Sequence, residues 1–301
     1  MNFDITILGS GSASPRLDRM PTAQHVKIHN YYFLFDCGEC TQFQLIKYNI
    51  SALKLDAIFI THLHGDHYLG LSGLLTSMAM LGRKRNLKIY APHGLKELIY
   101  NQIFKDKTPP VFEIEFINTN PTNPETILSN EHFYIKSIPL AHGIECCGFL
   151  IQEIEKNKLD KTKIQHLKQH EIISLKNKKN IFDNNGNLTH NWEDYSLPLS
   201  LPRSYAYITD TQYLENIIPE LTNCNVLYHE STFLEELRDR ATKTQHSTAK
   251  DAAKIAQLSK VKKLILGHFS SRYEDLSKFE AEAKEIFPEV ILAHDGMKFS
   301  L

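Results

Sequence analysis

A dense group of metal-ligand side chains lies in the run Thr61-His62-Leu63-His64-Gly65-Asp66-His67. Imidazole and carboxylate groups are the ligands that borderline cations such as zinc prefer. His62 and His64 are two positions apart, so an extended backbone points both side chains to the same side. Gly65 permits a sharp turn, after which Asp66 and His67 can face a second point. A polar loop of chance composition is the alternative, but so dense a ligand set is rare without a metal.

Further ligands are expected elsewhere, because this run alone cannot complete two metal sites. His142, Asp210 and His268 each follow an apolar run that predicts a strand. Open α/β sheets place their sites just past the carboxyl ends of strands. Taken singly, each of the three is more often an ordinary loop residue, but their shared position favours a role as ligands. His246 precedes a possible helix cap at Ser247, and without further information it is more often an ordinary residue at a helix start.

The elements that must position these residues alternate along the chain. Strands are predicted at 5–8, 31–35, 57–60, 87–90, 205–208, 226–228 and 264–266, and helices at 41–50, 69–81 and 246–258. Strands that alternate with helices in both halves predict a layered α/β fold. The length of 301 residues permits one large domain with a substantial core, and we expect a single domain over residues 1–301.

The stretch from about 152 to 200 differs in composition and is predicted to be an inserted arm. Residues 152–180 hold eight lysines against four acids, a local excess of four positive charges. The formal net charge of the whole chain is −1, so any binding of nucleic acid requires local basic clusters. The densest clusters are Arg83-Lys84-Arg85 and the stretch from Lys156 to Lys179. A solvated, charged surface is the plainer interpretation of this arm.

The remaining composition indicates a cytoplasmic protein with no membrane partner. The first residues lack the basic region and the small-residue cleavage site of a secretory signal, and no apolar run reaches membrane-spanning length. The five cysteines form no dense pairing pattern, which indicates a reducing compartment. Cys37 and Cys40 form a C-x-x-C without a second pair, so we interpret them as ordinary small residues.

The ordered motifs of the chain resemble the metallo-β-lactamase superfamily. The run 61–67 is followed by Pro139–Gly143, Thr209–Thr211 and Gly267–Phe269. Further motifs resemble the ribonuclease Z family within it: Leu8–Pro15, Phe35–Glu39, His229–Thr232, His246–Ala249 and Ser270–Tyr273. The resemblance implies a four-layered αβ/βα sandwich with an inserted basic arm.

The resemblance also implies roles for individual residues. It implies two zinc ions per chain held by seven side chains: His62, His64 and His142 for the first, Asp66, His67 and His268 for the second, with Asp210 bridging both. Asp66 would also act as general base, and His246, with Glu230 behind it, would assist the leaving oxygen. Two metals can supply hydroxide at neutral pH and neutralise charge on a phosphate in the transition state.

The activity implied is that of a zinc-dependent endoribonuclease that removes 3′ trailers from tRNA precursors. The family is commonly a homodimer in which the arm of one subunit clamps tRNA for the other. The loop Pro15–Met20 departs from the family pattern, because Leu17 and Met20 stand where Lys and Asn are usual. The cleavage register relative to a 3′ CCA therefore stays open, although Arg16 and Arg19 could still meet phosphate.

Two other functions are weighed against this one. The first is another phosphodiesterase of the same fold that acts on small phosphodiesters or other RNA and has no use for a basic arm. The second is a binding module without catalysis, which the seven filled ligand positions disfavour.

Overall fold

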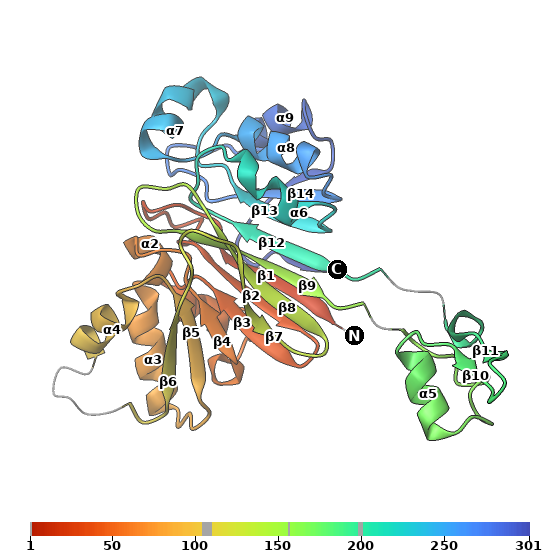
Figure 1. The fold of residues 1–301 in the computed structure, drawn as a ribbon. Coiled ribbons are helices and arrows are strands. Elements are labelled where there is room, and N and C mark those ends of the chain that lie inside the picture. The colour runs from red at the N-terminus through yellow and green to blue at the C-terminus, as the bar shows by residue number, and fades with distance from the viewer. Residues whose placement is uncertain (1, 104–109, 156, 198–200) are drawn as a thin grey trace. The chain divides into compact units, whose positions relative to one another are not determined.

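The structure is a computed structural model that describes residues 2–103, 110–155, 157–197 and 201–301. The chain divides into two compact units (Figure 1). The first unit consists of Met1–Ile127, Ile135–Ile151 and Ser204–Leu301, and the second of Leu128–Tyr134 and Gln152–Arg203.

The first of two seven-stranded sheets comprises β1 (Phe3–Gly9), β2 (Ala23–Ile28), β3 (Tyr31–Phe35), β4 (Ala57–Phe59), β5 (Leu87–Ala91), β6 (Ile114–Asn118) and β16 (Lys298–Ser300). Its strand order is β16-β1-β2-β3-β4-β5-β6. The strands from β16 to β3 pair antiparallel, and those from β3 to β6 run parallel. The last strand, β16, therefore pairs with the first strand, β1, so both ends of the chain contribute strands to the same sheet.

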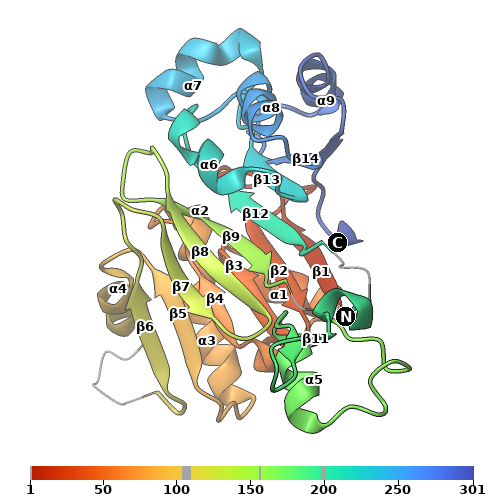
Figure 2. The ribbon, with the colours of Figure 1, turned by 45° about the vertical axis from the view of Figure 1, so that its right-hand side comes forward.

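The second sheet comprises β7 (Glu125–Ser129), β8 (Phe133–Pro139), β9 (Cys147–Glu153), β12 (Ser204–Ile208), β13 (Val226–Glu230), β14 (Lys263–Gly267) and β15 (Val290–Leu292). Its strand order is β15-β14-β13-β12-β9-β8-β7, and β12 to β15 are parallel. Figure 2 shows β9, β8 and β7 continuing this sheet beyond β12.

The helices of the first unit cover the outer faces of the two sheets. They are α1 (Thr41–Lys47), α2 (Gly65–Tyr68), α3 (Gly70–Met80), α4 (Leu95–Ile103), α6 (Ile218–Leu221), α7 (Arg238–Thr244), α8 (Ala249–Leu258) and α9 (Ser277–Lys284). Figure 1 shows α3 and α4 on the side of the first sheet, and α8 and α9 on the side of the second. This order of helix, sheet, sheet and helix confirms the predicted α/β fold class.

Aromatic side chains fill the space between the two sheets. The ring of Phe35 on β3 lies 5.5 Å from that of Phe149 on β9 and 6.0 Å from that of Tyr207 on β12, measured between centroids. All three side chains are fully buried. Because side chains alternate across a strand, the other face of the first sheet presents Leu34, Ile58 and similar residues to the helices. Both faces of the parallel strands are thus apolar, as the sequence pattern indicates.

The helix predicted over 246–258 begins at Ala249. Thr248 is its N-cap, and its side chain accepts a hydrogen bond from the backbone N–H of Asp251 while Asp251 caps in return. This capping box ends the preceding loop and leaves His246 outside the helix.

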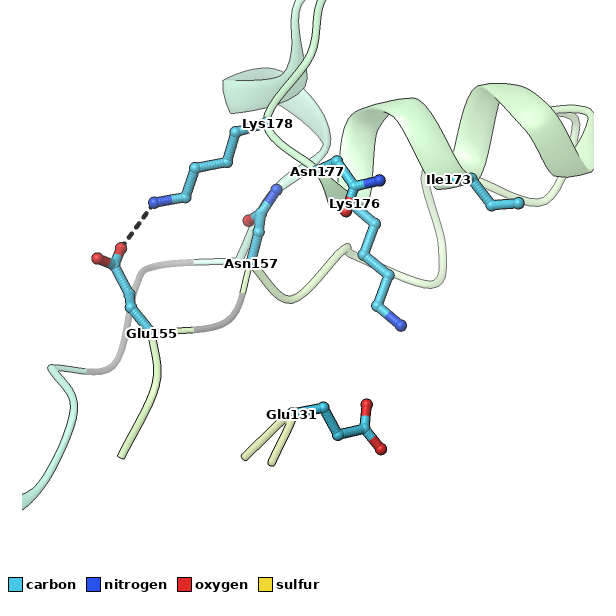
Figure 3. Close-up of a pocket in the computed structure, with 7 residues that line it drawn as sticks. All are labelled: Glu131, Glu155, Asn157, Ile173, Lys176, Asn177 and Lys178. Carbon is cyan, nitrogen blue, oxygen red and sulfur yellow. Dashed lines mark hydrogen bonds and ion pairs between the residues drawn. The ribbon is translucent and has the colours of Figure 1, made fainter. Parts of the chain in front are cut away.

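The second unit contains α5 (Gln169–Lys176) and a small hairpin of β10 (Ile181–Phe182) and β11 (Leu188–His190). The side chain of Leu175, on α5, is fully buried in this unit, and Asn157 donates a hydrogen bond of 2.9 Å to the Leu175 carbonyl. Beside them lies a pocket of about 610 Å³ (Figure 3). Lys178 at its edge pairs with Glu155 at 2.8 Å and lies over the Trp192 ring, whereas Lys176 projects from the end of α5.

Arg83, in the dense basic cluster at residues 83–85, has a structural role. Arg83 is 3% exposed, and its guanidinium donates to the carbonyls of Leu53 and Leu55. Arg85 pairs with Asp56. These contacts fasten the turn after α3 to the segment before β4, and those of Arg83 use the donors that its guanidinium could offer to a phosphate.

The arginines of the loop after β1 are held in a similar way. Arg19 is 5% exposed and donates to the Tyr273 carbonyl, and Arg16 donates to the Ser271 carbonyl and to Asp18. Leu17 between them is fully exposed.

In the described ranges, no helix is both long enough and apolar enough to cross a membrane.

Two glycines of α3 allow a test of how tightly the metal-ligand run is packed. A Cβ at Gly70 would lie 2.1 Å from the carbonyl oxygen of Gly38, whereas a Cβ at Gly73 would lie 3.4 Å from the end of the Gln42 side chain. We expect Gly70→Ala to lower the free energy of unfolding by about 1–3 kcal/mol, because backbone must shift. Gly73→Ala, the matched control, is expected to raise it by up to about 1 kcal/mol through helix propensity. Urea unfolding measures both, and equal effects would contradict this packing.

Candidate metal centre

The loop after β4 and the short helix α2 carry four of the predicted ligands. β4 ends at Phe59, and α2 begins at Gly65 with His64 as its N-cap. His62 and His67 are fully buried, the Asp66 side chain is 8% exposed, and His64 is exposed. The extended stretch before α2 directs His62 and His64 to one side, and the helical turn brings Asp66 and His67 to the other.

The other three predicted ligands come from separate strand ends. His142 lies between β8 and β9, Asp210 lies two residues after β12, and His268 directly follows β14. Asp210 and His268 have positive φ angles of 51° and 57°. L residues rarely adopt this left-handed conformation, and such strain is concentrated at functional sites. It turns the chain sharply, so that both side chains face the loop 61–67.

The first group consists of His62, His64, His142 and Asp210. The Nδ1 atom of His64 lies 3.0 Å from Nε2 of His62 and 3.1 Å from Nε2 of His142. Oδ2 of Asp210 lies 3.6 Å from Nε2 of His62 and 3.8 Å from Nε2 of His142. Four ligand atoms from three parts of the chain therefore meet at one point.

The second group consists of Asp66, His67 and His268. Oδ2 of Asp66 lies 3.4 Å from Nε2 of His67 and 3.5 Å from Nε2 of His268. Oδ1 of Asp210 lies 3.3 Å and 3.1 Å from the same two nitrogens. The two oxygens of the Asp210 carboxylate thus face different groups, so this side chain is placed to bridge them.

The chemistry and spacing of these atoms fit metal ions of the zinc type. Metal–ligand bonds of about 2.0–2.1 Å in a tetrahedral site separate neighbouring ligand atoms by about 3.3 Å, and the observed separations scatter around that value. The Nε2 atoms of His67 and His268 are buried, and no described residue gives either one a hydrogen bond. Buried polar atoms without a partner are costly, and a cation at the second group would satisfy both.

The second ring nitrogen of each buried histidine has a defined partner. Nδ1 of His67 donates to Asp36 at 2.8 Å, and Nδ1 of His268 donates to the Thr232 hydroxyl at 2.9 Å. Nδ1 of His142 donates to the Gln245 carbonyl at 3.1 Å. These bonds leave the Nε2 lone pairs directed at the cluster, as in metal sites whose ligands are oriented by outer partners.

Asp36 is the most connected of these outer partners, and sequence reasoning assigned it no role. Its carboxylate accepts hydrogen bonds from Nδ1 of His67 at 2.8 Å, the Thr61 backbone N–H at 2.8 Å, the Thr61 hydroxyl at 3.0 Å and the Tyr207 hydroxyl at 2.8 Å. It is fully buried and has a φ angle of 55°. A polar residue directly after the β3 strand was the available signal, but the same signal marks many loop residues.

Glu230 and His246 form a separate pair beside the cluster. Glu230 ends β13 and is fully buried, and its Oε1 accepts from Nδ1 of His246 at 2.8 Å. Burial disfavours a charged His246, but the Glu230 carboxylate outweighs it and raises the pKa of His246 to about 9. The His246 side chain is 16% exposed, so it can present a proton to a molecule bound at the cluster.

The cluster concentrates negative charge. Burial alone would lower the pKa of His67, but Asp210, Asp66 and Asp36 outweigh it and hold that pKa well above its usual value. Burial and the neighbouring His67 lower the pKa of His62 well below its usual value, so this imidazole is neutral. A neutral imidazole is the form that binds metal, and a cation would balance the carboxylates.

Known proteins resemble this chain over nearly its whole length. A family model described as Anti-Pycsar protein Apyc1 matches residues 3–287. A ribonuclease Z of Cytophaga hutchinsonii is 44% identical, with 99% of this chain and 96% of that protein covered. A ribonuclease Z of Phocaeicola vulgatus is 38% identical, with 99% and 97% covered.

Among solved structures, the short form of human tRNase Z is 27% identical and superposes with a TM-score of 0.71, covering 99% of this chain and 98% of that one. The metallo-β-lactamase fold protein YhfI of Bacillus subtilis has the same TM-score, 0.71, at 20% identity, with 100% of both chains covered. The second likeness concerns the fold alone.

The contacts of Asp36 generate a prediction about metal affinity. Asp36→Asn removes the charge that orients His67, so we expect metal to bind about 10- to 100-fold more weakly, the usual effect of losing an outer partner. Tyr207→Phe is the matched control, because it removes one hydrogen bond to Asp36 and keeps the carboxylate. Competition with a chromogenic zinc chelator measures both. Unchanged affinity in Asp36→Asn, or an equal loss in both variants, would contradict the role given to Asp36.

Proposed function

Because the chain belongs to the ribonuclease Z family, we propose that its cluster holds two zinc ions and hydrolyses the phosphodiester bond before the 3′ trailer of a tRNA precursor. The chain also belongs to the family described as Anti-Pycsar protein Apyc1. It is a tRNA 3′-processing endoribonuclease, a hydrolase of the metallo-β-lactamase fold. The observation that carries the metal proposal is the Asp210 carboxylate, whose two oxygens face two separate ligand groups.

The ligand assignment follows the two groups. We assign the first zinc ion to His62, His64 and His142, the second to Asp66, His67 and His268, and the bridging position to Asp210. When bound, the zinc ions would supply Lewis-acid chemistry, which yields hydroxide at neutral pH and balances charge on the phosphate.

The remaining steps belong to side chains of this chain. Asp66 lies at the cluster with 8% of its side chain exposed, and its ionised carboxylate can accept the proton of the attacking water. As the bond from phosphorus to the leaving oxygen breaks, His246 donates its proton to that oxygen. Glu230 keeps His246 protonated and oriented through the contact at Nδ1, which leaves Nε2 as the donor.

We assign the second unit to binding of the RNA backbone, as a tRNA-binding arm inserted into the single catalytic domain. Seven of the lysines in residues 152–180 are described, and all seven are exposed. Lys178 is paired with Glu155, and the ammonium of Lys163 is held by the Asp194 carbonyl at 2.7 Å. Cations gathered in one compact unit let a protein of net charge −1 bind a polyanion.

We further assign the functional state to a homodimer in the cytoplasm. The adjacent helices α1 and α3 expose Phe43 (67%), Ile46 (74%), Met80 (76%) and, just past α3, Leu81 (66%). Neighbouring exposed apolar side chains are typical of protein interfaces. All five cysteines are free thiols, which supports a reducing compartment.

Light scattering tests the proposed homodimer. It should give twice the 34.6 kDa of one chain, and a mass of one chain at micromolar concentration would contradict the dimer.

The Glu230–His246 pair generates a prediction about pH. A rate that depends on protonated His246 falls as pH rises through the pKa of this residue, which is about 9. Glu230→Gln removes the carboxylate that contributes most to raising this pKa, so burial lowers the pKa with only Asp210 acting against it. We therefore expect the basic limb of the kcat/KM profile to move to lower pH in Glu230→Gln. A profile that keeps its basic limb in this variant would show that His246 is not the proton donor.

Two substrates test the proposed function together with the arm. We expect the zinc-loaded enzyme to cut a 3′-extended tRNA precursor at one position and also to hydrolyse a chromogenic aryl phosphodiester. Replacing Lys161, Lys163 and Lys168 by Ala should raise KM for the precursor and flatten its salt dependence, because fewer counterions are released. Hydrolysis of the small substrate should be unchanged, since it needs only the metal centre.

The matched control replaces Lys260, Lys262 and Lys263, three exposed lysines of the first unit, by Ala. It should leave KM for the precursor unchanged. Activity on the aryl phosphodiester without cleavage of tRNA would favour the alternative, a small-substrate phosphodiesterase of the same fold. Equal losses in both triple variants would contradict an RNA-binding role of the arm.

A further inference from the structure

A cavity lies in the first unit and shares no residue with the metal centre. It has a volume of about 460 Å³ and is lined by side chains of β16, β1, β2 and β3, the turn after α1, and Lys54. We call it the outer groove and define it by Thr6, His25, Lys27, Tyr32, Tyr48, Lys54 and Lys298. Its volume lies in the range of small-molecule sites.

The strand pattern explains why polar side chains line this groove. On β2, Val26 and Ile28 are fully buried, whereas His25 and Lys27, which alternate with them, point to the opposite face of the sheet. The outer face of the sheet is therefore polar at this end, whereas it is apolar under α3.

Positive charge converges on the outer groove. Lys27, Lys54 and Lys298 line it, and Asp4 is the one carboxylate among its described lining residues. Asp4 already accepts a hydrogen bond of 2.6 Å from the Ser300 hydroxyl. The ammonium groups of Lys27 and Lys54 lie 5.7 Å and 5.9 Å from the centre of the same Tyr32 ring. Three cations around one cavity favour an anionic ligand.

His25 adds a buried group that lacks a partner. It is only 6% exposed although it lines the groove, and its Nε2 atom has no hydrogen-bond partner among the described residues. Burial, together with Lys298 and Lys27, lowers the pKa of His25 to about 4, so the ring is neutral at pH 7. A buried ring nitrogen without a partner is costly unless a ligand or water satisfies it.

Two tyrosine rings complete the lining. Tyr32 lies on β3, and its ring centroid is 6.1 Å from that of His25. Tyr48 follows α1 and packs on Gly296 so closely that a Cβ there would lie 2.5 Å from the ring. Both tyrosines are only partly buried. Aromatic faces beside lysines are a common platform for a nucleobase joined to a phosphate.

We propose that the outer groove is a second ligand site that binds a nucleoside monophosphate. The lysines would hold the phosphate, a tyrosine face would stack on the base, and the buried imidazole would supply one hydrogen bond. Charge alone would fit any small anion, but the two aromatic rings favour one that carries a flat ring. The inference concerns residues outside the metal centre, so it stands or falls independently of the proposed function.

The experiment follows the His25 side chain by NMR in the zinc-loaded full chain. Histidine is labelled isotopically, and the His25 signal is identified by its absence in His25→Gln. Adenosine 5′-monophosphate is the probe, with adenosine and inorganic phosphate as separate arms. We expect the monophosphate to shift the His25 signal in a saturable way and to bind at least about tenfold more tightly than either fragment, because each part contributes contacts.

Lys27→Met with Lys298→Met should weaken the monophosphate at least about tenfold, since charge-assisted bonds to phosphate are lost. The matched control is Lys262→Met with Lys263→Met, two exposed lysines outside the groove, and it should bind normally. Unchanged urea unfolding would show that both variants are folded. A His25 signal that the monophosphate does not move, equal affinity for either fragment, or equal weakening in the control would overturn the proposal.

Discussion

The buried carboxylate of Asp36 is the constraint on which the rest of the site depends. It accepts hydrogen bonds from the loop of the first sheet, through Thr61 and His67, and from Tyr207 on the second sheet. A fully buried carboxylate must be satisfied on both oxygens, because an unpaired buried charge is very costly. The two sheets and the loop 61–67 therefore share one anchor. Any shift of one sheet against the other would break bonds that also orient a predicted metal ligand.

The ligand atoms gather where strands end, and the backbone is strained to bring them there. Asp36, Asp210 and His268 all have positive φ angles within two residues of a strand end. The rigid parallel strands and the aromatic packing between the sheets hold these conformations, which would be unfavourable in a free loop. Metal binding and folding are expected to support each other here, since cations would stabilise a cluster of carboxylates and unpartnered imidazoles.

The distribution of charge separates the surfaces of the protein by role. The chain as a whole is nearly neutral, yet the described lysines of residues 152–180 are exposed, whereas Arg83 and Arg19 are buried against carbonyl partners. An arginine near a turn can stabilise the turn, because the several N–H donors of its guanidinium form hydrogen bonds with more than one backbone carbonyl. Lysines with one mobile charge remain available to ligands, both on the second unit and around the outer groove.

Local spacing determined much of this protein. The α/β fold, most strand and helix positions, and the candidates in the run 61–67 follow from side-chain periodicity and from ligand chemistry, which act between neighbours in the chain. Their position just past predicted strands also made His142, Asp210 and His268 candidates for the same site. Only the tertiary structure decided the contacts of Asp36, Arg83 and His25. Nothing near Asp36 in the sequence predicts that it joins His67 to Tyr207, and nothing near Arg83 predicts that its charge is buried. His25 likewise becomes notable only once β16, β1 and β3 lie around it. These contacts are set by strand order and by the packing of two sheets, and hydrophobic burial over the whole chain determines both.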